Sequence, residues 1–197
     1  MDDLKIGQDK TKNNSSGILY LHDLVYMLAG VLLVFLLVFR LVVVSGFSMF
    51  QTLTDGDHLL LLSSVFYQNP KAGDVVVVSK KSFDDGAPIV KRVIATEGQT
   101  VDIDFDAGIV YVDGQPLAEP YTNTPTNLRE GMEFPLTVEE GCIFVMGDNR
   151  NDSKDSRNPV IGQVDEREVL GKAILLVLPG VDVNTQKRDF SRMGAVR

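Results

Sequence analysis

Hydrophobic residues divide the chain into one long apolar segment near the N-terminus and a later region of short apolar runs. Residues 1–17 are polar and rich in Asp, Lys, Asn and Ser, a composition that predicts a disordered tail. Residues 18–44 are strongly apolar, with an unbroken centre from Leu24 to Phe39. About 20 helical residues span a hydrocarbon core of about 30 Å. The pattern therefore predicts one transmembrane helix over 18–44.

A cleavable signal peptide is the alternative interpretation of this apolar segment. No Ala-x-Ala site follows it, and the segment is longer than a usual signal-peptide core, so an anchor is favoured. Three lysines precede the segment, whereas no Lys or Arg lies between Arg40 and Lys71. Basic residues are enriched on the cytoplasmic side of a membrane. We therefore expect a single-pass protein of the cytoplasmic membrane, with its N-terminus in the cytoplasm and the later residues outside.

The region after the anchor has the pattern of β-strands. Short apolar runs separated by Gly, Asp, Asn and Pro lie at 58–63, 74–79, 88–95, 108–112, 142–146 and 169–178. Several runs are apolar at successive positions, which indicates central strands buried on both faces. No amphipathic helix of convincing length is found in this region. The pattern predicts a mostly β domain over residues 45–180.

A smaller β lobe is expected inside this domain. Residues 104–140 are more polar and richer in turn residues than the rest, as an insertion into the core sheet would be. Within them, 108–120 reads as a hairpin whose turn is Asp113-Gly114. Residues 181–197 follow the last apolar run and are expected to form a C-terminal tail.

Composition and charge exclude several classes of function. With 197 residues and a net charge of −8, the chain can bury a core but lacks the clustered basic face that nucleic-acid binding requires. Cys142 is the only cysteine, so no internal disulfide can form, and its apolar neighbours predict a small buried residue. Zinc-type Cys/His spacings and phosphate-binding glycine loops are absent from the sequence. We expect neither a metal nor a cofactor.

The densest polar cluster is the stretch from Gly147 to Arg157. It follows the apolar run 142–146 and contains two Arg, three Asp and two Ser in eleven positions. A polar turn is the simplest interpretation, because such residues favour turns. A calcium loop is disfavoured, because Arg150 stands where Asp or Asn is needed and Ser153 where Gly is needed. So many hydrogen-bonding groups after a buried strand favour a functional site.

Ser48 is a candidate nucleophile close to the membrane. Large apolar residues surround it, Phe47, Met49 and Phe50, where a solvated linker would be polar. It follows Arg40 by eight positions, and at about 3.3–3.6 Å per residue it lies within roughly 30 Å of the bilayer edge.

A nucleophilic serine needs a base, and neither histidine is suitable. His22 lies inside the apolar segment, and His58 adjoins Asp57, which points to the opposite face of a strand. A Ser/Lys dyad is the remaining route. Lys91 lies in an apolar strand, where burial disfavours the ammonium and lowers its pKa from about 10.4. A strand lysine that extends to the surface is the alternative interpretation of Lys91.

Three sequence motifs together resemble those of bacterial type I signal peptidases. They are Ser45-Gly46-Phe47-Ser48-Met49-x-x-Thr52-Leu53, Lys91-Arg92-Val93-Ile94 and Gly147-Asp148-Asn149-Arg150-x-x-Ser153-x-Asp155-Ser156-Arg157. With the preceding apolar segment, the resemblance covers about residues 20–180. It implies a membrane-anchored serine endopeptidase with a mostly β catalytic domain outside the membrane, which removes signal peptides from exported preproteins. Its expected partners are signal-peptide-bearing preproteins and membrane lipid, and we expect a monomer.

The resemblance also implies roles for individual residues. Ser48 corresponds to the nucleophile and Lys91 to the general base. Ser153 is implied to hydrogen-bond and orient the Lys91 amine, and Met49 to pack near the substrate channel. A charge network beside the dyad is implied for Asp148, Arg150, Asp155 and Arg157. Shallow pockets for small substrate residues are expected beside residues such as Ile89 and Val93.

The chain departs from the family pattern at several positions. Gln51 stands where the family usually has Pro, which predicts a looser turn at Ser48. Gly46 offers no hydroxyl to an oxyanion hole, so the Ser48 N–H is expected to be the principal donor. Ala95, Glu97 and Gln99 replace the residues commonly found after the Lys-Arg motif.

Two alternatives to this function stay open at this point. A self-cleaving repressor-type Ser/Lys protease has a related β fold, but the anchor and the lack of a DNA-binding helix pair disfavour it. A membrane-tethered assembly factor of the same fold, catalytically weak or inactive, is the alternative outside the active enzymes. Such a protein is expected to have lost Ser48 or Lys91, and both are present.

Overall fold

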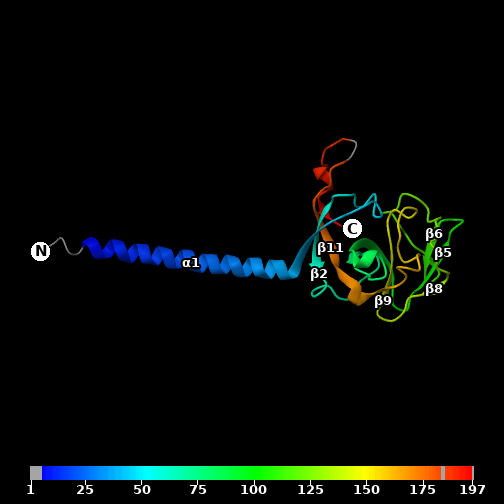
Figure 1. The fold of residues 1–197 in the computed structure, drawn as a ribbon, viewed down its shortest axis with the longest axis horizontal. Helices are drawn as coiled ribbons and strands as arrows, with labels where there is room; N and C mark the ends of the chain where they lie inside the picture. The colour runs from blue at the N-terminus through cyan, green and yellow to red at the C-terminus, as the bar shows by residue number, and fades with distance from the viewer. Residues whose placement is uncertain (1–5, 183–184, 197) are drawn as a thin grey trace. The chain divides into compact units, whose positions relative to one another are not determined.

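A computed structural model describes residues 6–182 and 185–196 in two units that divide after Val38 (Figure 1). The first unit is one helix, α1 (Ile6–Val38), whose part Gly17–Val38 is long and apolar enough to cross a membrane. The predicted disorder of the tail is wrong for residues 6–17, which are helical. Once a helix is nucleated, each added residue gains a hydrogen bond, so a strong helix extends into polar neighbours. Residues 1–5 lie outside the described residues.

The end of the apolar segment belongs to the second unit. Phe39–Val43 form strand β1, which pairs antiparallel with β2 (His58–Ser63), and Val44 is buried in the core. The prediction that the transmembrane helix continues to residue 44 is therefore wrong. The valines at its end fit a pleated strand better than a helix, because a β-branched side chain is restricted at χ1 in a helix.

The main sheet has eight strands and contains most of the predicted ones. In spatial order it runs β1-β2-β11-β3-β4-β9-β10, with β12 paired to β11. All pairs in it are antiparallel. The further strands are β3 (Val75–Val78), β4 (Ile89–Thr96), β9 (Cys142–Met146), β10 (Val164–Asp165), β11 (Val169–Leu178) and β12 (Gly194–Ala195). The predicted mostly β architecture is confirmed.

A second, smaller sheet forms the expected lobe, seen on the right in Figure 1. Its order is β7-β6-β5-β8, with β5 (Thr100–Asp104), β6 (Ile109–Val112), β7 (Gln115–Pro116) and β8 (Leu136–Thr137). The hairpin turn lies at Asp113-Gly114, whose φ values of 52° and 74° suit the type I′ geometry. The lobe begins at Thr100, earlier than residue 104, because the alternating run 100–104 forms its central strand.

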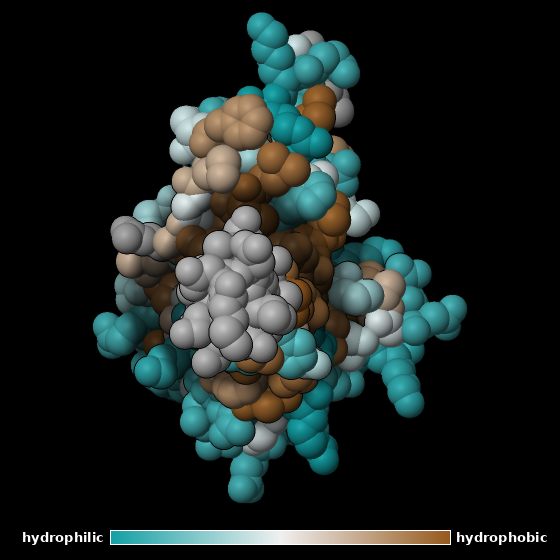
Figure 2. All heavy atoms as spheres, turned by 90° about the vertical axis from the view of Figure 1, so that its left-hand side faces the viewer, coloured by the Kyte–Doolittle hydropathy of each residue, from teal (hydrophilic) through white to brown (hydrophobic). Residues whose placement is uncertain are grey.

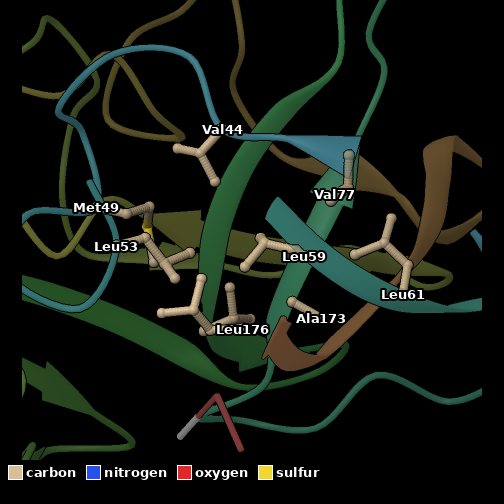
Figure 3. Close-up of a cluster of buried hydrophobic side chains, with 9 residues drawn as sticks. Val44, Met49, Leu53, Leu59, Leu61, Val77, Ala173 and Leu176 are labelled. Atoms are coloured by element: carbon tan, nitrogen blue, oxygen red, sulfur yellow. The ribbon is translucent and has the colours of Figure 1, made fainter. Parts of the chain in front are cut away.

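One hydrophobic cluster carries the loop that contains Ser48. Met49 and Leu53 from this loop pack with strand residues that include Leu59 and Leu176 (Figure 3). Met49 is 1% exposed within this cluster, and its expected place near the substrate channel stays a prediction. Burying a Leu or Met side chain contributes about 1.5–3 kcal/mol. Val44, which precedes Ser48, belongs to the same cluster, so the loop is fixed to the sheet on both sides of Ser48.

The described part of the C-terminal tail is folded onto the same unit. β12 pairs with β11, Val181 bridges Arg188, and a short 3-10 helix, η3, covers Phe190–Arg192. This segment is the red projection at the top of the β unit in Figure 1, and the top of Figure 2 shows hydrophilic and hydrophobic residues mixed on it. Two other 3-10 helices are η1 (Asp84–Gly86) and η2 (Glu166–Glu168). Cys142 is half-buried at the start of β9, rather than fully buried as expected.

Candidate active site

Ser48 and Lys91 are in direct contact, although 43 positions separate them in the sequence. The Lys91 Nζ donates a hydrogen bond to the Ser48 Oγ at 2.6 Å. Lys91 lies on β4, opposite Val76 of β3, and Ser48 lies in the loop between β1 and β2. The fold thus brings together the two residues expected as nucleophile and base.

The Lys91 amine is buried and its pKa is low for a lysine. Lys91 is 3% exposed, so its side chain does not extend to the surface, and the alternative interpretation of a surface lysine is wrong. Burial lowers the pKa of Lys91 from 10.5 to about 8, against the opposing effect of the Asp155 carboxylate. A substantial fraction of the amine is therefore neutral at mildly alkaline pH, and only the neutral amine can accept a proton.

The Ser48 loop is held by backbone hydrogen bonds within itself and to the polar cluster after β9. Within the loop, the Phe50 N–H donates to the Phe47 carbonyl and the Leu53 N–H to the Met49 carbonyl. The Asn149 N–H donates to the Ser48 carbonyl at 3.0 Å, which connects the nucleophile to the polar cluster after β9. Among the described residues, the Ser48 N–H makes no backbone hydrogen bond. It remains free to act as an oxyanion donor.

Within the polar cluster, Asp155 and Arg157 form a buried ion pair. The Arg157 Nε and Nη2 donate to the two carboxylate oxygens of Asp155, each at 2.8 Å. Arg157 also donates to the Arg150 carbonyl at 2.7 Å, and Asp155 accepts from the Gly147 N–H at 3.0 Å. Both carboxylate oxygens of Asp155 thus accept hydrogen bonds that fold the loop, which is a structural role.

Asp148 has a partner that the sequence motifs did not pair with it. The Arg92 Nε and Nη2 donate to its two oxygens, each at 2.7 Å, and both side chains are buried. The Thr52 Oγ1 also donates to Asp148. Arg92 follows Lys91 and Thr52 follows the nucleophile closely, so this one carboxylate joins β4 to the Ser48 loop.

Arg150 likewise pairs outside the expected network. It forms an ion pair with Glu119 and donates to the Thr126 Oγ1 at 3.0 Å. The ring of Tyr121 lies 3.9 Å from the Arg92 guanidinium and 5.9 Å from that of Arg150. Sequence reasoning missed Glu119 and Tyr121, because they lie in a turn-rich stretch with no motif.

Ser153 does not make the hydrogen bond to Lys91 that the resemblance implies. Its Oγ is buried and has no hydrogen-bond partner among the described residues, while the Lys91 amine donates to Ser48. The Ser153 hydroxyl lies close to Gly147, which has no Cβ. A Cβ added there would lie 2.2 Å from the Ser153 Oγ and 2.4 Å from the Ser48 carbonyl oxygen. Gly147 is therefore a second place, beside the Asn149–Ser48 hydrogen bond, where the polar cluster approaches the nucleophile.

We expect Gly147→Ala to lower kcat about 100-fold or more, because the added methyl group must displace the Ser48 backbone and small misplacements cost about that much. Cleavage kinetics of the purified variant, with circular dichroism as the check on folding, test this. A folded variant with the wild-type kcat would contradict the close approach.

A small hollow adjoins the Ser48–Lys91 contact. It has a volume of about 70 Å³ and is lined by residues 42–45, Ser48, Val77 and residues 88–91. Ile89 is in this lining, as expected for a substrate pocket. Val93 is not, because it is fully buried in the core with Val76 and Ile143. The hollow has room for a small side chain only.

Asp57 and His58 take no part in this site. Asp57 accepts hydrogen bonds from the Gly180 N–H and from Arg192, and the His58 Nδ1 contacts the Gly56 carbonyl. The Arg192 and backbone donors outweigh the effect of burial and lower the pKa of Asp57. The expectation that this pair is unsuited to a triad agrees with these contacts.

The chain combines a β fold and an apolar helix with a serine in contact with a buried lysine, an arrangement suited to a serine-type peptidase. Residues 18–178 match the family model described as "Signal peptidase, peptidase S26", and the chain belongs to this family. It is 39% identical over 140 residues to "Probable signal peptidase I-1" of Synechocystis, covering 67% of each chain. It is 31% identical over 181 residues to "Signal peptidase I" of Bacillus licheniformis, covering 87% of this chain and 95% of that protein. A crystal structure of a signal peptidase I from Enterococcus faecalis aligns with a TM-score of 0.43 and 31% identity, over 53% of this chain and 97% of that chain.

Proposed function

We propose that this protein is a membrane-bound serine endopeptidase that removes N-terminal signal peptides from exported preproteins, with Ser48 as nucleophile and Lys91 as general base. The observation that carries the proposal is the 2.6 Å contact between the Ser48 Oγ and the buried Lys91 Nζ. The membership of the chain in the signal peptidase family supports the substrate class.

The first half of the reaction forms an ester on Ser48. The neutral Lys91 amine accepts the Ser48 hydroxyl proton as the Oγ attacks the scissile carbonyl carbon. The resulting oxyanion accepts a hydrogen bond from the Ser48 N–H. The tetrahedral intermediate then breaks its C–N bond, and the Lys91 ammonium gives its proton to the departing amine. The mature protein leaves, and the signal peptide remains esterified to Ser48.

The second half releases the signal peptide by hydrolysis. Lys91 is neutral again after protonating the amine, so it accepts a proton from water as the water oxygen attacks the ester carbonyl. The C–Oγ bond breaks, Ser48 regains the proton from Lys91, and the signal peptide leaves with a new carboxylate. Every proton transfer uses the same amine, so one group with a pKa near neutrality is sufficient.

The small hollow suits the residue before the scissile bond. At about 70 Å³, with Val42–Val44 and Ile89 in its lining, it accepts a side chain such as that of Ala and excludes larger ones. The helix Gly17–Val38 supplies a membrane anchor by length and composition. With the basic residues before it, the proposed topology has a cytoplasmic N-terminus and the peptidase unit outside the membrane.

We expect kcat/KM for preprotein cleavage to rise about tenfold per pH unit and to level off above pH 8. The active form of Lys91 is the neutral amine, and burial lowers its pKa to about 8, so the active fraction grows until the pH passes that value. The rate profile measured between about pH 6 and pH 10 tests this. A profile centred near pH 6.5, the ordinary value for histidine, would contradict the lysine base.

The proposed function is tested by incubating the purified full-length protein in detergent with a preprotein that carries Ala before the scissile bond. We expect release of the mature N-terminus, and no cleavage of the matched preprotein with Leu at that position. Failure to cleave any signal-bearing substrate would favour the tethered assembly factor instead.

A further inference from the structure

A second, larger cavity lies beside the nucleophile loop and is not used in the mechanism above. Its volume is about 600 Å³, within the range of ligand-binding pockets. Phe47 and Phe50, the residues around Ser48, line it together with Asn149. The wall formed by the C-terminal segment includes Asp182 and Asp189.

This C-terminal wall lies outside the part of the chain that matches the family model, which ends at residue 178. It is nevertheless fixed to the nucleophile loop by Arg192. The Arg192 guanidinium donates to both carboxylate oxygens of Asp57 at 3.0 and 2.7 Å, to the Thr54 Oγ1 at 2.9 Å and to the Thr52 carbonyl at 3.4 Å. The wall therefore belongs to the described fold of the peptidase unit.

The lining of the large cavity is acidic and aromatic. Asp55, Asp182 and Asp189 contribute carboxylates, and Arg192, the one cation among the described lining residues, is paired with Asp57. Phe47 and Phe50 are exposed and can offer their ring faces to a cation. A positively charged side chain suits this combination, whereas a carboxylate is repelled by it.

The two cavities have no lining residue in common, and the nucleophile loop contributes to both. Ser45 and Ser48 line the small hollow, whereas Phe47, Phe50 and Gln51 line the large cavity. A peptide with its scissile carbonyl at Ser48 and its preceding side chain in the small hollow must continue past this loop. The large cavity borders this same loop, so it is space available to the residues that follow the scissile bond.

We propose that the large cavity binds the first residues of the mature protein, after the scissile bond, and that it favours Lys or Arg there. This inference rests on the proposed function, because it needs a preprotein bound across Ser48. It assigns the described residues of the C-terminal segment, 181–182 and 185–196, a role in substrate selection.

The test uses two preproteins that differ only in having Lys or Glu at the second residue after the scissile bond. For the purified full-length protein in a non-ionic detergent, we expect kcat/KM to be about fivefold higher for the Lys substrate, the size that partly exposed charge pairs give. In Asp182→Asn/Asp189→Asn this ratio should fall below about twofold. Asn can still accept from the Thr185 and Ser191 N–H groups that these carboxylates bind, so the local turns are retained.

The matched control is Asp104→Asn/Asp113→Asn in the smaller sheet. These carboxylates also accept backbone N–H bonds and lie outside the cavity lining, so the variant removes the same charge and should keep the fivefold ratio. Equal kcat/KM for both substrates in the wild type would overturn this inference and leave the proposed function standing. The same loss of preference for the Lys substrate in both double variants would do so too. If the wild type cleaves neither substrate, the proposed function fails and this inference fails with it.

Discussion

Lys91→Met is expected to abolish preprotein cleavage and, at the same time, to raise thermal stability. The variant has no group that can take the Ser48 proton, so kcat should fall by about 10⁴-fold. Burial lowers the pKa of the Lys91 amine from 10.5 to about 8, which corresponds to roughly 3 kcal/mol of destabilisation when the amine is charged. A thioether of similar length removes this cost. Thermal unfolding and cleavage assays on the same preparation measure both effects.

The stability gain should depend on pH in a defined direction. Between pH 8 and 10.5 the unfolded wild-type chain binds more protons at Lys91 than the folded chain, so wild-type stability rises with pH there. The advantage of Lys91→Met should therefore be full below about pH 8 and vanish near pH 10.5. The exposed Lys81→Met is the control and should change neither property. An active variant, or one less stable than wild type at neutral pH, would contradict the buried-base account.

Arg157→Ala is expected to lower the free energy of unfolding by about 3–5 kcal/mol, because it leaves the buried Asp155 carboxylate without its cation. The chain contains a matched exposed pair, Asp165 and Arg167, with the same spacing and the same two-bond geometry. The Arg157 side chain is 0% exposed and that of Arg167 is 90% exposed. Arg167→Ala should therefore cost less than about 1 kcal/mol.

Denaturant unfolding of the two variants beside wild type measures this difference. Equal losses in Arg157→Ala and Arg167→Ala would show that burial of the Asp155–Arg157 pair does not determine its contribution. A loss of activity in Arg157→Ala without a loss of stability would point instead to a direct part in catalysis, which its contacts do not support.

The strands that sequence predicted best are those buried on both faces. Uninterrupted runs such as Val75–Val78 and Cys142–Met146 have few competing interpretations and were placed within a residue. Strand β5, by contrast, alternates Val and Ile with Asp, and its short length and acidic residues conceal it among turns. The apolar run at 39–44 was assigned to the helix, because apolar character alone does not distinguish a buried strand from a membrane span.

At the site, sequence identified the residues but not all of their partners. Ser48 and Lys91 meet as expected, since both motifs carry an order and spacing that resemblance can transfer. The pairings of Asp148 with Arg92 and of Arg150 with Glu119 could not be predicted, because sequence spacing does not determine which buried charges face each other. The packing of Met49 into the core cluster was likewise not predicted from the sequence.

The central claim is that Ser48 is the nucleophile of a signal peptidase. The most direct measurement is the N-terminus of the product, determined by mass spectrometry, after a preprotein is incubated with wild type, Ser48→Ala or the control Ser82→Ala. We predict that wild type and Ser82→Ala release the same mature N-terminus and that folded Ser48→Ala releases none. Cleavage at the same bond by Ser48→Ala would contradict the account.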